Sequence, residues 1–436
     1  MSTWQDLVTA SLIGTERAEV PPAGVPGVLT SDPVTTAQDP AAVLLDRAAL
    51  LTAARRAGWR PGQADPLPAA EPDPAPPVGR AAARRLARML GGEHPDLLAE
   101  WLAAVVTRGL RAPAQSLPAL LDRARRAGPA HARLRRLVAE AGGSRARWLA
   151  GLNPDWKFVA EPVPADEAWR LGDGGQRRSY LAALRARDPR AARKLIAASW
   201  KAADGDRAMF LSVLAENLSL ADERLLEAAL GDPAEDVRDR AAYLLASLPG
   251  SALGQRMAGR ARGFLCLRQG TRGMRLIVSP PPRSDASMRR DGITAGPAAG
   301  PAPQAARARL VLEVLARTPL RTWTDEFGLA PAQIAALPAG SWAPVLLAGW
   351  ARAAIAQRDE EWITALVTNA LAGPSSGPAA DDTALRELAR RADPALAAPG
   401  ALPDPEPGGP AVVNAAAAVL RFRYEMLKEL DDDHGG

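Results

Sequence analysis

Two Asp-Pro pairs, Asp188-Pro189 and Asp232-Pro233, stand 44 residues apart in the middle of the chain. An Asp that accepts amide hydrogen bonds, followed by a Pro at the first helical position, favours the start of a helix. Glu235 follows Asp232 by three residues, the spacing of a capping box. Helical apolar stripes fill the stretch between the two pairs. The pattern therefore predicts helix pairs that recur with a fixed period, and each Asp-Pro pair marks a helix start.

This period resembles that of HEAT-type repeats, which are helix pairs of about 40–47 residues. The best match is GDPAEDVRDRAAYLLASLPG at residues 231–250. In that family an Asp and a basic residue form a ladder between neighbouring repeats. The resemblance gives this structural role to Asp188, Lys194, Asp232 and Arg238. The expected fold class is mostly α, a HEAT-like α-solenoid of stacked helical hairpins with a small β-hairpin insertion.

Composition supports a helical chain. Aromatic residues make up only 4% of the 436 residues, and Ala, Leu and Arg are abundant, which disfavours a β-sandwich or barrel. One segment departs from the helical pattern, GFLCLRQGTRGMRLIVSPPP at 263–282, where short apolar runs flank Gly270 and Gly273. This arrangement predicts a β-hairpin. Cys266 lies in the first apolar run, and we expect a buried, unreactive thiol there.

Proline- and glycine-rich stretches divide the chain. Residues 61–79 hold seven prolines, a composition that cannot propagate a helix and predicts an extended, exposed linker. The expected segments are an N-terminal helical segment (1–60), this linker (61–79), a basic helical segment (80–150), HEAT-like repeats (151–262), the hairpin insertion (263–282), a second linker (283–306) and a C-terminal helical segment (307–436).

The sequence indicates no reaction chemistry. One cysteine excludes an internal disulfide and a thiolate-rich metal site, and three scattered histidines do not suggest a metal cluster. We therefore predict no catalytic residues, no metal ligands and no cofactor, and a protein that is not an enzyme. The carboxylates of Asp325 and Glu326 fall near a predicted helix start, where they complement the helix dipole. An unrecognised hydrolase that uses this pair is the weakest alternative.

The tryptophans Trp148, Trp156, Trp323, Trp342, Trp350 and Trp362 lie at helix starts or on apolar stripes. Large aromatic side chains at such positions are expected to fill the core between helices. Anchoring a partner protein is the other role open to them, because tryptophan is enriched at interface hot spots.

Positive charge is concentrated in residues 80–147, which hold 14 Arg against 5 Asp and Glu, a net +9. Such a block attracts nucleic acid or an acidic partner, although a solvated helix face is the simpler interpretation. No aromatic residue lies between Trp101 and Trp148 to stack on bases. The possible contacts with a partner or with nucleic acid are Arg123, Arg125, Arg126, Arg133, Arg135 and Arg136.

Several stretches together resemble an uncharacterised bacterial helical-repeat family that is encoded beside MoxR-type AAA+ ATPases, von Willebrand factor A-domain proteins and SWIM zinc-finger proteins. They are WQDLVTASLIGTER, RARWLAGLNPDW, PPPRSDASMRRDGI and LRTWTDEF, with SWAPVLLAGWARAA and EEWITALV downstream. The resemblance supplies no catalytic residue. What it implies is a protein partner from one of those three classes.

The leading interpretation is a non-enzymatic scaffold or adaptor whose stacked helices bind a protein, and the alternative is nucleic-acid binding through residues 80–147. The N-terminus lacks the basic and apolar regions of a signal peptide. No stretch reaches the roughly 18 apolar residues of a membrane span. We therefore expect a cytoplasmic protein with no membrane contact.

Overall fold

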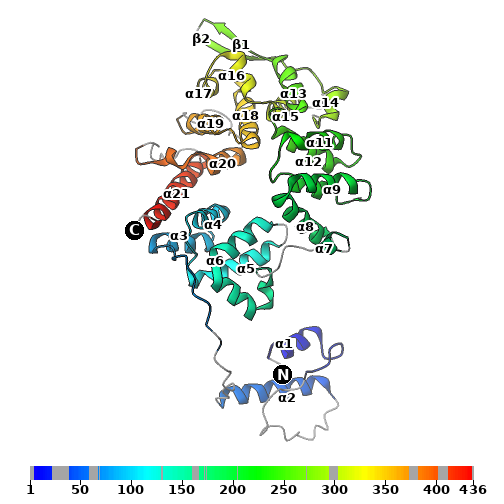
Figure 1. Ribbon diagram of the computed structural model, residues 1–436, viewed down its shortest axis with the longest axis vertical. Coiled ribbons are helices and arrows are strands. Elements are labelled where there is room, and N and C mark those ends of the chain that lie inside the picture. The colour runs from blue at the N-terminus through cyan, green and yellow to red at the C-terminus, as the bar shows by residue number, and fades with distance from the viewer. Residues whose placement is uncertain are drawn as a thin grey trace. The chain divides into compact units, whose positions relative to one another are not determined.

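The computed structural model (Figure 1) is described over residues 4–21, 39–57, 67, 69–128, 131–159, 166–170, 172, 174–203, 205–271, 273–293, 303–372, 382–400 and 411–434. The chain divides into two compact units, Met1–Ala69 and Ala70–Gly436. Helices dominate both units, and the sheet of the described part has two antiparallel strands. The predicted mostly-α class with a small β-hairpin is confirmed.

The first unit consists of two helices, α1 (Trp4–Ile13) and α2 (Pro40–Arg56). Asp39 caps α2, because its side chain accepts a hydrogen bond from the Ala41 amide and Pro40 occupies the first helical position. Only three hydrophobic side chains of the described unit are buried, and they are Leu7, Ala10 and Ala54. Two helices with so few buried side chains gain little of the free energy that stabilises a domain.

The second unit begins with four helices that share one hydrophobic core. They are α3 (Arg80–Leu90), α4 (Leu98–Thr107), α5 (Leu117–Ala127) and α6 (Ala132–Leu152). Trp101 on α4 is fully buried in this core. Short 3-10 turns join these and later helices: η1 (Pro95–Leu97), η2 (Ala114–Ser116), η4 (Pro154–Val159), η5 (Leu220–Asp222), η6 (Gly340–Trp342) and η7 (Pro394–Ala397).

A kink in α6 anchors the end of the proline-rich segment. Gly143 adopts φ 57°, and a Cβ there would meet the Asp73 carboxylate at 1.8 Å. Asp73 accepts hydrogen bonds from the amide and hydroxyl of Ser144, so it caps the second half of α6 from another segment. Burial alone would raise the pKa of Asp73, but these hydrogen bonds outweigh it and hold the pKa below its ordinary value. The end of the predicted linker is thus extended but fixed.

The middle of the second unit contains the region of the predicted repeats. Its helices are α7 (Asp166–Arg170), α8 (Gly174–Arg187), α9 (Pro189–Ser199), α10 (Arg207–Val213), α11 (Glu223–Ala229), α12 (Glu235–Ala246) and α13 (Ala252–Arg262). Asp188 caps α9 as predicted, by accepting from the Ala191 amide. The second predicted start is wrong by two residues, because the Asp232 side chain accepts from the Ala234 amide in a turn before the helix. Glu235 is therefore the first helical residue rather than part of a capping box.

The hairpin lies where the sequence predicts it. Strands β1 (Leu265–Gly270) and β2 (Gly273–Val278) pair from Leu265 opposite Val278 to Gly270 opposite Gly273. Cys266 is exposed, so the expectation of a buried thiol is wrong. Successive side chains of a strand point to opposite faces, and because Leu265 is buried, Cys266 points outward.

The predicted second linker, 283–306, is partly helical. It contains α14 (Ala286–Arg290), capped by Asp285 through the Met288 amide, and the buried residues Met288 and Ile293. Asp291 is also buried and forms ion pairs with Arg256 and Arg260 on α13. This part of the segment is therefore packed rather than extended, and its residues 294–302 lie outside the described residues.

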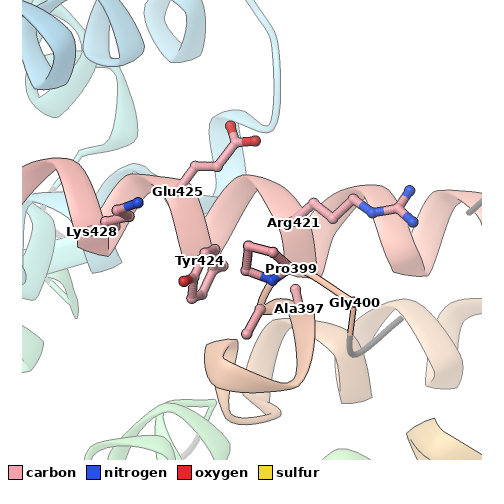
Figure 2. Close-up of a pocket in the computed structure, with 8 residues that line it drawn as sticks. Ala397, Pro399, Gly400, Arg421, Tyr424, Glu425 and Lys428 are labelled. Carbon is pink, nitrogen blue, oxygen red and sulfur yellow. The ribbon is translucent and has the colours of Figure 1, made fainter. Parts of the chain in front are cut away.

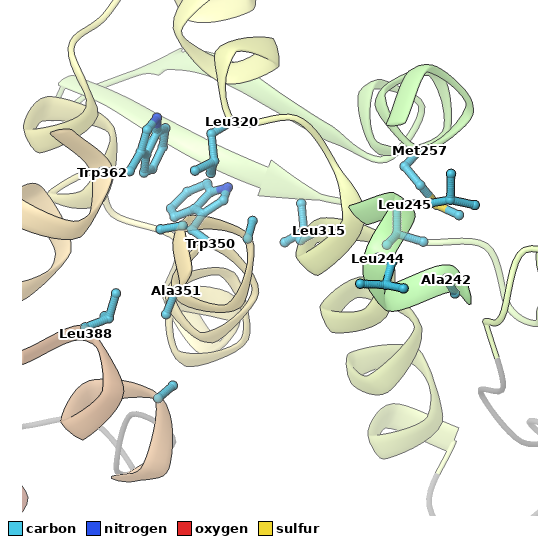
Figure 3. Packing of buried hydrophobic residues seen from close by; sticks show 14 of the residues in the cluster. Ala242, Leu244, Leu245, Met257, Leu315, Leu320, Trp350, Ala351, Trp362 and Leu388 are labelled. Atoms are coloured by element: carbon cyan, nitrogen blue, oxygen red, sulfur yellow. The ribbon is translucent and has the colours of Figure 1, made fainter. Parts of the chain in front are cut away.

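The described residues from 303 onward contain the helices α15 (Pro303–Arg317), α16 (Arg321–Phe327), α17 (Pro331–Ala335), α18 (Ala343–Gln357), α19 (Glu360–Ala372), α20 (Asp382–Arg391) and α21 (Ala411–His434). Trp323, Trp350 and Trp362 are almost completely buried, which confirms their predicted place in the core. The other three tryptophans of that prediction, Trp148, Trp156 and Trp342, are only half-buried. Figure 3 shows Trp350 on α18 among Leu320, Trp362 and neighbouring side chains.

Candidate functional site

The last helix, α21, joins two hydrophobic cores of the second unit. Its first half, through Leu420, belongs to the large core formed by α8 to α20. Its second half supplies Phe422, Met426 and Leu430 to the core of α3 to α6. These three residues recur every four positions and so lie on one face of the helix. The contact of α21 with α3 and α4 therefore links segments that are more than 300 residues apart in the sequence (Figure 1).

Arginine–carboxylate pairs line the contact between α21 and helices α3 and α4, which we call the seam. Arg85 of α3 is only 4% exposed; it donates to Glu429 at 2.6 Å and Glu425 at 2.8 Å, and its guanidinium lies over the Phe422 ring. Arg423 of α21 donates to Glu100 at 2.7 Å and to two backbone carbonyls, and Arg108 donates to Asp431. The acidic residues of α21 thus compensate part of the positive charge of residues 80–147.

We expect Arg85→Ala to lower the free energy of unfolding by about 2–3 kcal/mol, because it leaves two carboxylates without their shared partner and uncovers the Phe422 ring. Arg84→Ala is the matched control, since Arg84 is exposed on the same helix and its loss is expected to cost less than about 0.5 kcal/mol. Urea unfolding followed by circular dichroism measures both. Equal effects from the two variants would contradict the assignment.

A second buried ion pair lies in the middle of the unit. Arg185 of α8 and Asp222 of η5 are both 0% exposed and are joined by two hydrogen bonds, of 2.6 and 3.0 Å. Arg193 of α9 also donates to Asp222, at 2.9 Å. Burial alone would raise the pKa of Asp222, but the hydrogen bonds from Arg185, Arg193 and the Ser219 amide outweigh it and hold the pKa below its ordinary value.

The four predicted ladder residues have mainly local contacts. Asp188 caps its own helix, Lys194 is exposed on α9, and Arg238 donates to the carbonyls of Asp232 and Pro233 in the turn before α12. Asp232 also accepts from Arg207 of α10 at 3.3 Å, and that contact does run between helices. The ladder role of the four residues stays a prediction. Among the described residues, the ion pair of Asp222 with Arg185 is more deeply buried than the contact between Asp232 and Arg207. No local sequence pattern indicated the pairs of Asp222 with Arg185 and Arg193.

The six basic residues singled out from the sequence lie at the end of α5 and the start of α6, helices that pack against each other. Arg125 is 3.8 Å from both Asp122 and Asp155, Arg136 is 3.9 Å from Glu140, and the Arg135 guanidinium lies over the Phe158 ring. Arg123 reaches the Pro95 carbonyl at 3.5 Å. Arg126 and Arg133 are exposed. Protein contacts therefore engage four of the six side chains.

A different group of arginines surrounds a pocket at the start of α3. This arginine pocket, of about 290 Å³, is lined by Pro77, Val78, Gly79, Arg80, Ala83, Arg111, Pro113, Ala114, Gln115 and Arg145. The backbones of Pro77 and Arg111 form a parallel bridge, which holds the two sides of the pocket together. None of the lining residues is acidic, so the pocket suits an anion.

A second pocket, of about 350 Å³, lies between η7 and α21 (Figure 2). Arg421, Tyr424, Glu425 and Lys428 line it from α21, and residues 397–400 line it from the other side. Its charges are mixed. Because Glu425 also pairs with Arg85, this pocket belongs to the seam described above.

Within the part of the chain that the structure describes, no three His, Cys, Asp or Glu side chains come together as metal ligands. Asp325 is exposed on α16, and Glu326 pairs with Arg262 at 3.1 Å. No described helix combines the length and the apolar character needed to cross a membrane.

Comparison with known proteins gives one match. The model of a family of unknown function, DUF5691, matches residues 6–401. The chain belongs to this family. No curated protein and no solved structure matches it. The expected membership of an uncharacterised family is confirmed, whereas the genes that neighbour the family stay part of the prediction.

The part of the chain that matches DUF5691 includes most of α1, all of α2, the arginine pocket and the Arg185–Asp222 pair. It ends before α21 begins at Ala411. The DUF5691 match therefore covers one side of the seam and omits the helix that completes it.

Proposed function

We propose that this DUF5691 protein is a non-enzymatic cytoplasmic scaffold or adaptor that binds a protein partner. The partners implied by the sequence resemblance are a MoxR-type AAA+ ATPase, a von Willebrand factor A-domain protein or a SWIM zinc-finger protein. The observation that carries the proposal is the uncovered apolar surface of the first unit, formed by Leu12, Ile13 and Leu45.

Large apolar side chains are exposed on the two helices of the first unit. Leu12 is 82% exposed, Leu45 is 67% exposed and Ile13 is 53% exposed. Burying one such side chain stabilises a complex by about 1.5–3 kcal/mol. Exposed apolar residues grouped on a small unit mark a protein-binding surface. A partner that covered them would supply the core that α1 and α2 lack.

The second unit suits a scaffold because its helices pack in succession. Contacts run from α8 to α10, from α10 to α12, from α12 to α15, from α15 to α18 and from α18 to α20. Helices that each contact the next-but-one or a later neighbour are typical of stacked hairpins, and we propose the HEAT-like arrangement on this basis. Such an array offers a long surface of side chains to a partner.

The test is direct binding between the purified full chain and the MoxR-type ATPase and A-domain protein of the same genome, measured by calorimetry. We expect Leu12→Asp combined with Leu45→Asp to weaken binding at least about tenfold, because two charges would enter an apolar interface. Leu152→Asp combined with Leu220→Asp is the matched control, since both leucines are exposed in the second unit. The proposal fails if the unaltered chain binds neither protein, or if the two double variants bind equally.

Nucleic-acid binding is the second candidate, favoured by the exposure of Arg126 and Arg133 at adjacent helix ends. The seam counts against it, because Glu425, Glu429 and Asp431 compensate arginines of the same basic block. It ranks below the scaffold for this reason.

A further inference from the structure

The arginine pocket brings together three side chains from separate parts of the chain. Arg80 is the first residue of α3, Arg111 follows α4, and Arg145 lies on α6 just after its kink. The bridge between Pro77 and Arg111 and the Asp73–Ser144 hydrogen bonds fix the backbone on two sides of the pocket. These positions are therefore held in place before any ligand binds, which lowers the entropic cost of binding.

The charge balance of the pocket is positive. Three guanidinium groups line it together with the amide side chain of Gln115, and no lining residue is acidic. The Asp73 carboxylate interacts electrostatically with Arg111, and it is already held by two hydrogen bonds from Ser144. Arg111 also has a buried Nε–H with no hydrogen-bond acceptor among the described residues. A buried donor of this kind is costly to leave unpaired.

Backbone geometry adds to the same field. Gly79 is the cap residue of α3, an 11-residue helix, Arg80 and Ala83 lie in its first turn, and all three line the pocket. The N-terminus of a helix carries a partial positive charge that favours phosphate groups. Gly79 precedes the helix as its cap residue and brings no side-chain acceptor to this turn.

We propose that this pocket binds the phosphate group of a small phosphorylated molecule, with a diphosphate or phosphate monoester as the ligand class. Guanidinium groups pair with phosphate oxygens through two parallel hydrogen bonds, a geometry that suits three arginines around one small pocket. A volume of about 290 Å³ lies at the lower end of ligand pockets, so it accommodates the phosphate part of a ligand rather than a large one. Ligand binding here is distinct from the partner surface of the first unit.

Calorimetry on the full chain tests the site with inorganic pyrophosphate and orthophosphate, in about 50 mM salt to limit screening. We expect saturable binding of pyrophosphate to one site, weakened at least about tenfold by Arg80→Gln combined with Arg145→Gln. Both arginines are exposed, so the double variant is expected to fold normally. Arg111→Lys keeps the charge but loses the paired geometry, and an intermediate loss is expected.

Arg126→Gln combined with Arg133→Gln is the matched control, because it removes two exposed arginines of the same basic block outside the pocket. The control is expected to bind pyrophosphate within about twofold of the unaltered chain. Absence of saturable binding up to about 5 mM pyrophosphate overturns the proposal. So does an equal loss in the control, which would show a diffuse charge effect. A short DNA duplex that binds through Arg80 and Arg145, where pyrophosphate does not, would assign the arginines to a nucleic-acid surface instead.

Discussion

Replacing Asp222 by asparagine is expected to lower the free energy of unfolding by about 3–5 kcal/mol, because the change leaves buried positive charge without its partner. Asparagine keeps the size of the side chain but has no charge, and it offers one acceptor oxygen where aspartate offers two. Arg185 would then be a fully buried cation compensated only by backbone carbonyls.

The contacts of Arg185 explain why losing the Asp222 charge would affect several helices. Besides Asp222, it donates to the carbonyls of Pro189, Leu214, Glu216 and Asn217. These acceptors lie at the start of α9 and in the loop after α10. Asn217 itself has φ 52°, in the left-handed region, so this loop is held in a backbone conformation that is uncommon for residues other than glycine. The ion pair therefore fixes how three helices meet.

The effect of Asp222→Asn is expected to depend on pH in a defined direction. The folded-state pKa of Asp222 is below its ordinary value, so its carboxylate stabilises the folded chain fully above about pH 4 and loses that contribution as the pH falls through the folded-state pKa. Urea unfolding of the unaltered chain and of Asp222→Asn, at pH 7 and at pH 3, measures the effect of the substitution. We expect a smaller effect at pH 3 than at pH 7. Asp325→Asn, an exposed aspartate, is the control and is expected to change stability by less than about 0.5 kcal/mol at either pH. A constant Asp222→Asn effect down to pH 3 would contradict the assigned role of the charge.

Local features of the fold follow from the sequence. The Asp188-Pro189 pair starts α9 because an N-cap carboxylate and a proline act within one turn. The hairpin follows from two short apolar runs around Gly270 and Gly273, and Gly273 adopts φ 107°, which suits glycine. The same local reasoning misplaces the helix start at Asp232, because the interhelix contact with Arg207 draws that carboxylate into a turn.

The long-range contacts could not be predicted from the sequence. Helical spacing places Arg85 on the same face of α3 as the buried apolar residues, whereas its neighbour Arg84 is exposed. No local pattern, however, identifies Glu429 as the partner of Arg85. The arginine pocket likewise joins Arg80, Arg111 and Arg145, which are separated along the chain by α3 to α5 and the first half of α6. The net charge of +9 over residues 80–147 indicates a basic region, but only the packing decides which arginines meet.

Trp350→Ala is expected to lower the free energy of unfolding by about 3–5 kcal/mol, which is the second large effect that we predict. Trp350 is 1% exposed and lies beside Trp362 (Figure 3). Its ring centroid is 5.5 Å from that of Trp362 and 6.3 Å from that of Trp323. Removing the middle ring of three leaves a cavity that two rigid aromatic neighbours cannot collapse to fill. Tyr243→Ala is the control, because Tyr243 is 50% exposed on α12 and makes few buried contacts.

Trp350→Phe separates the ring volume from the indole N–H. The Nε1 atoms of Trp350 and Trp323 are buried without a hydrogen-bond acceptor among the described residues. Phenylalanine removes an unsatisfied donor along with part of the ring, so the two effects oppose each other and we expect a net cost below about 1.5 kcal/mol. Unfolding by urea, followed at 222 nm because tryptophan fluorescence changes with the substitution, compares the variants. If Trp350→Phe lowers the free energy of unfolding as much as Trp350→Ala, the prediction is wrong. The indole N–H would then have a partner that stabilises the core, and the volume of the ring would not be the main contribution of Trp350.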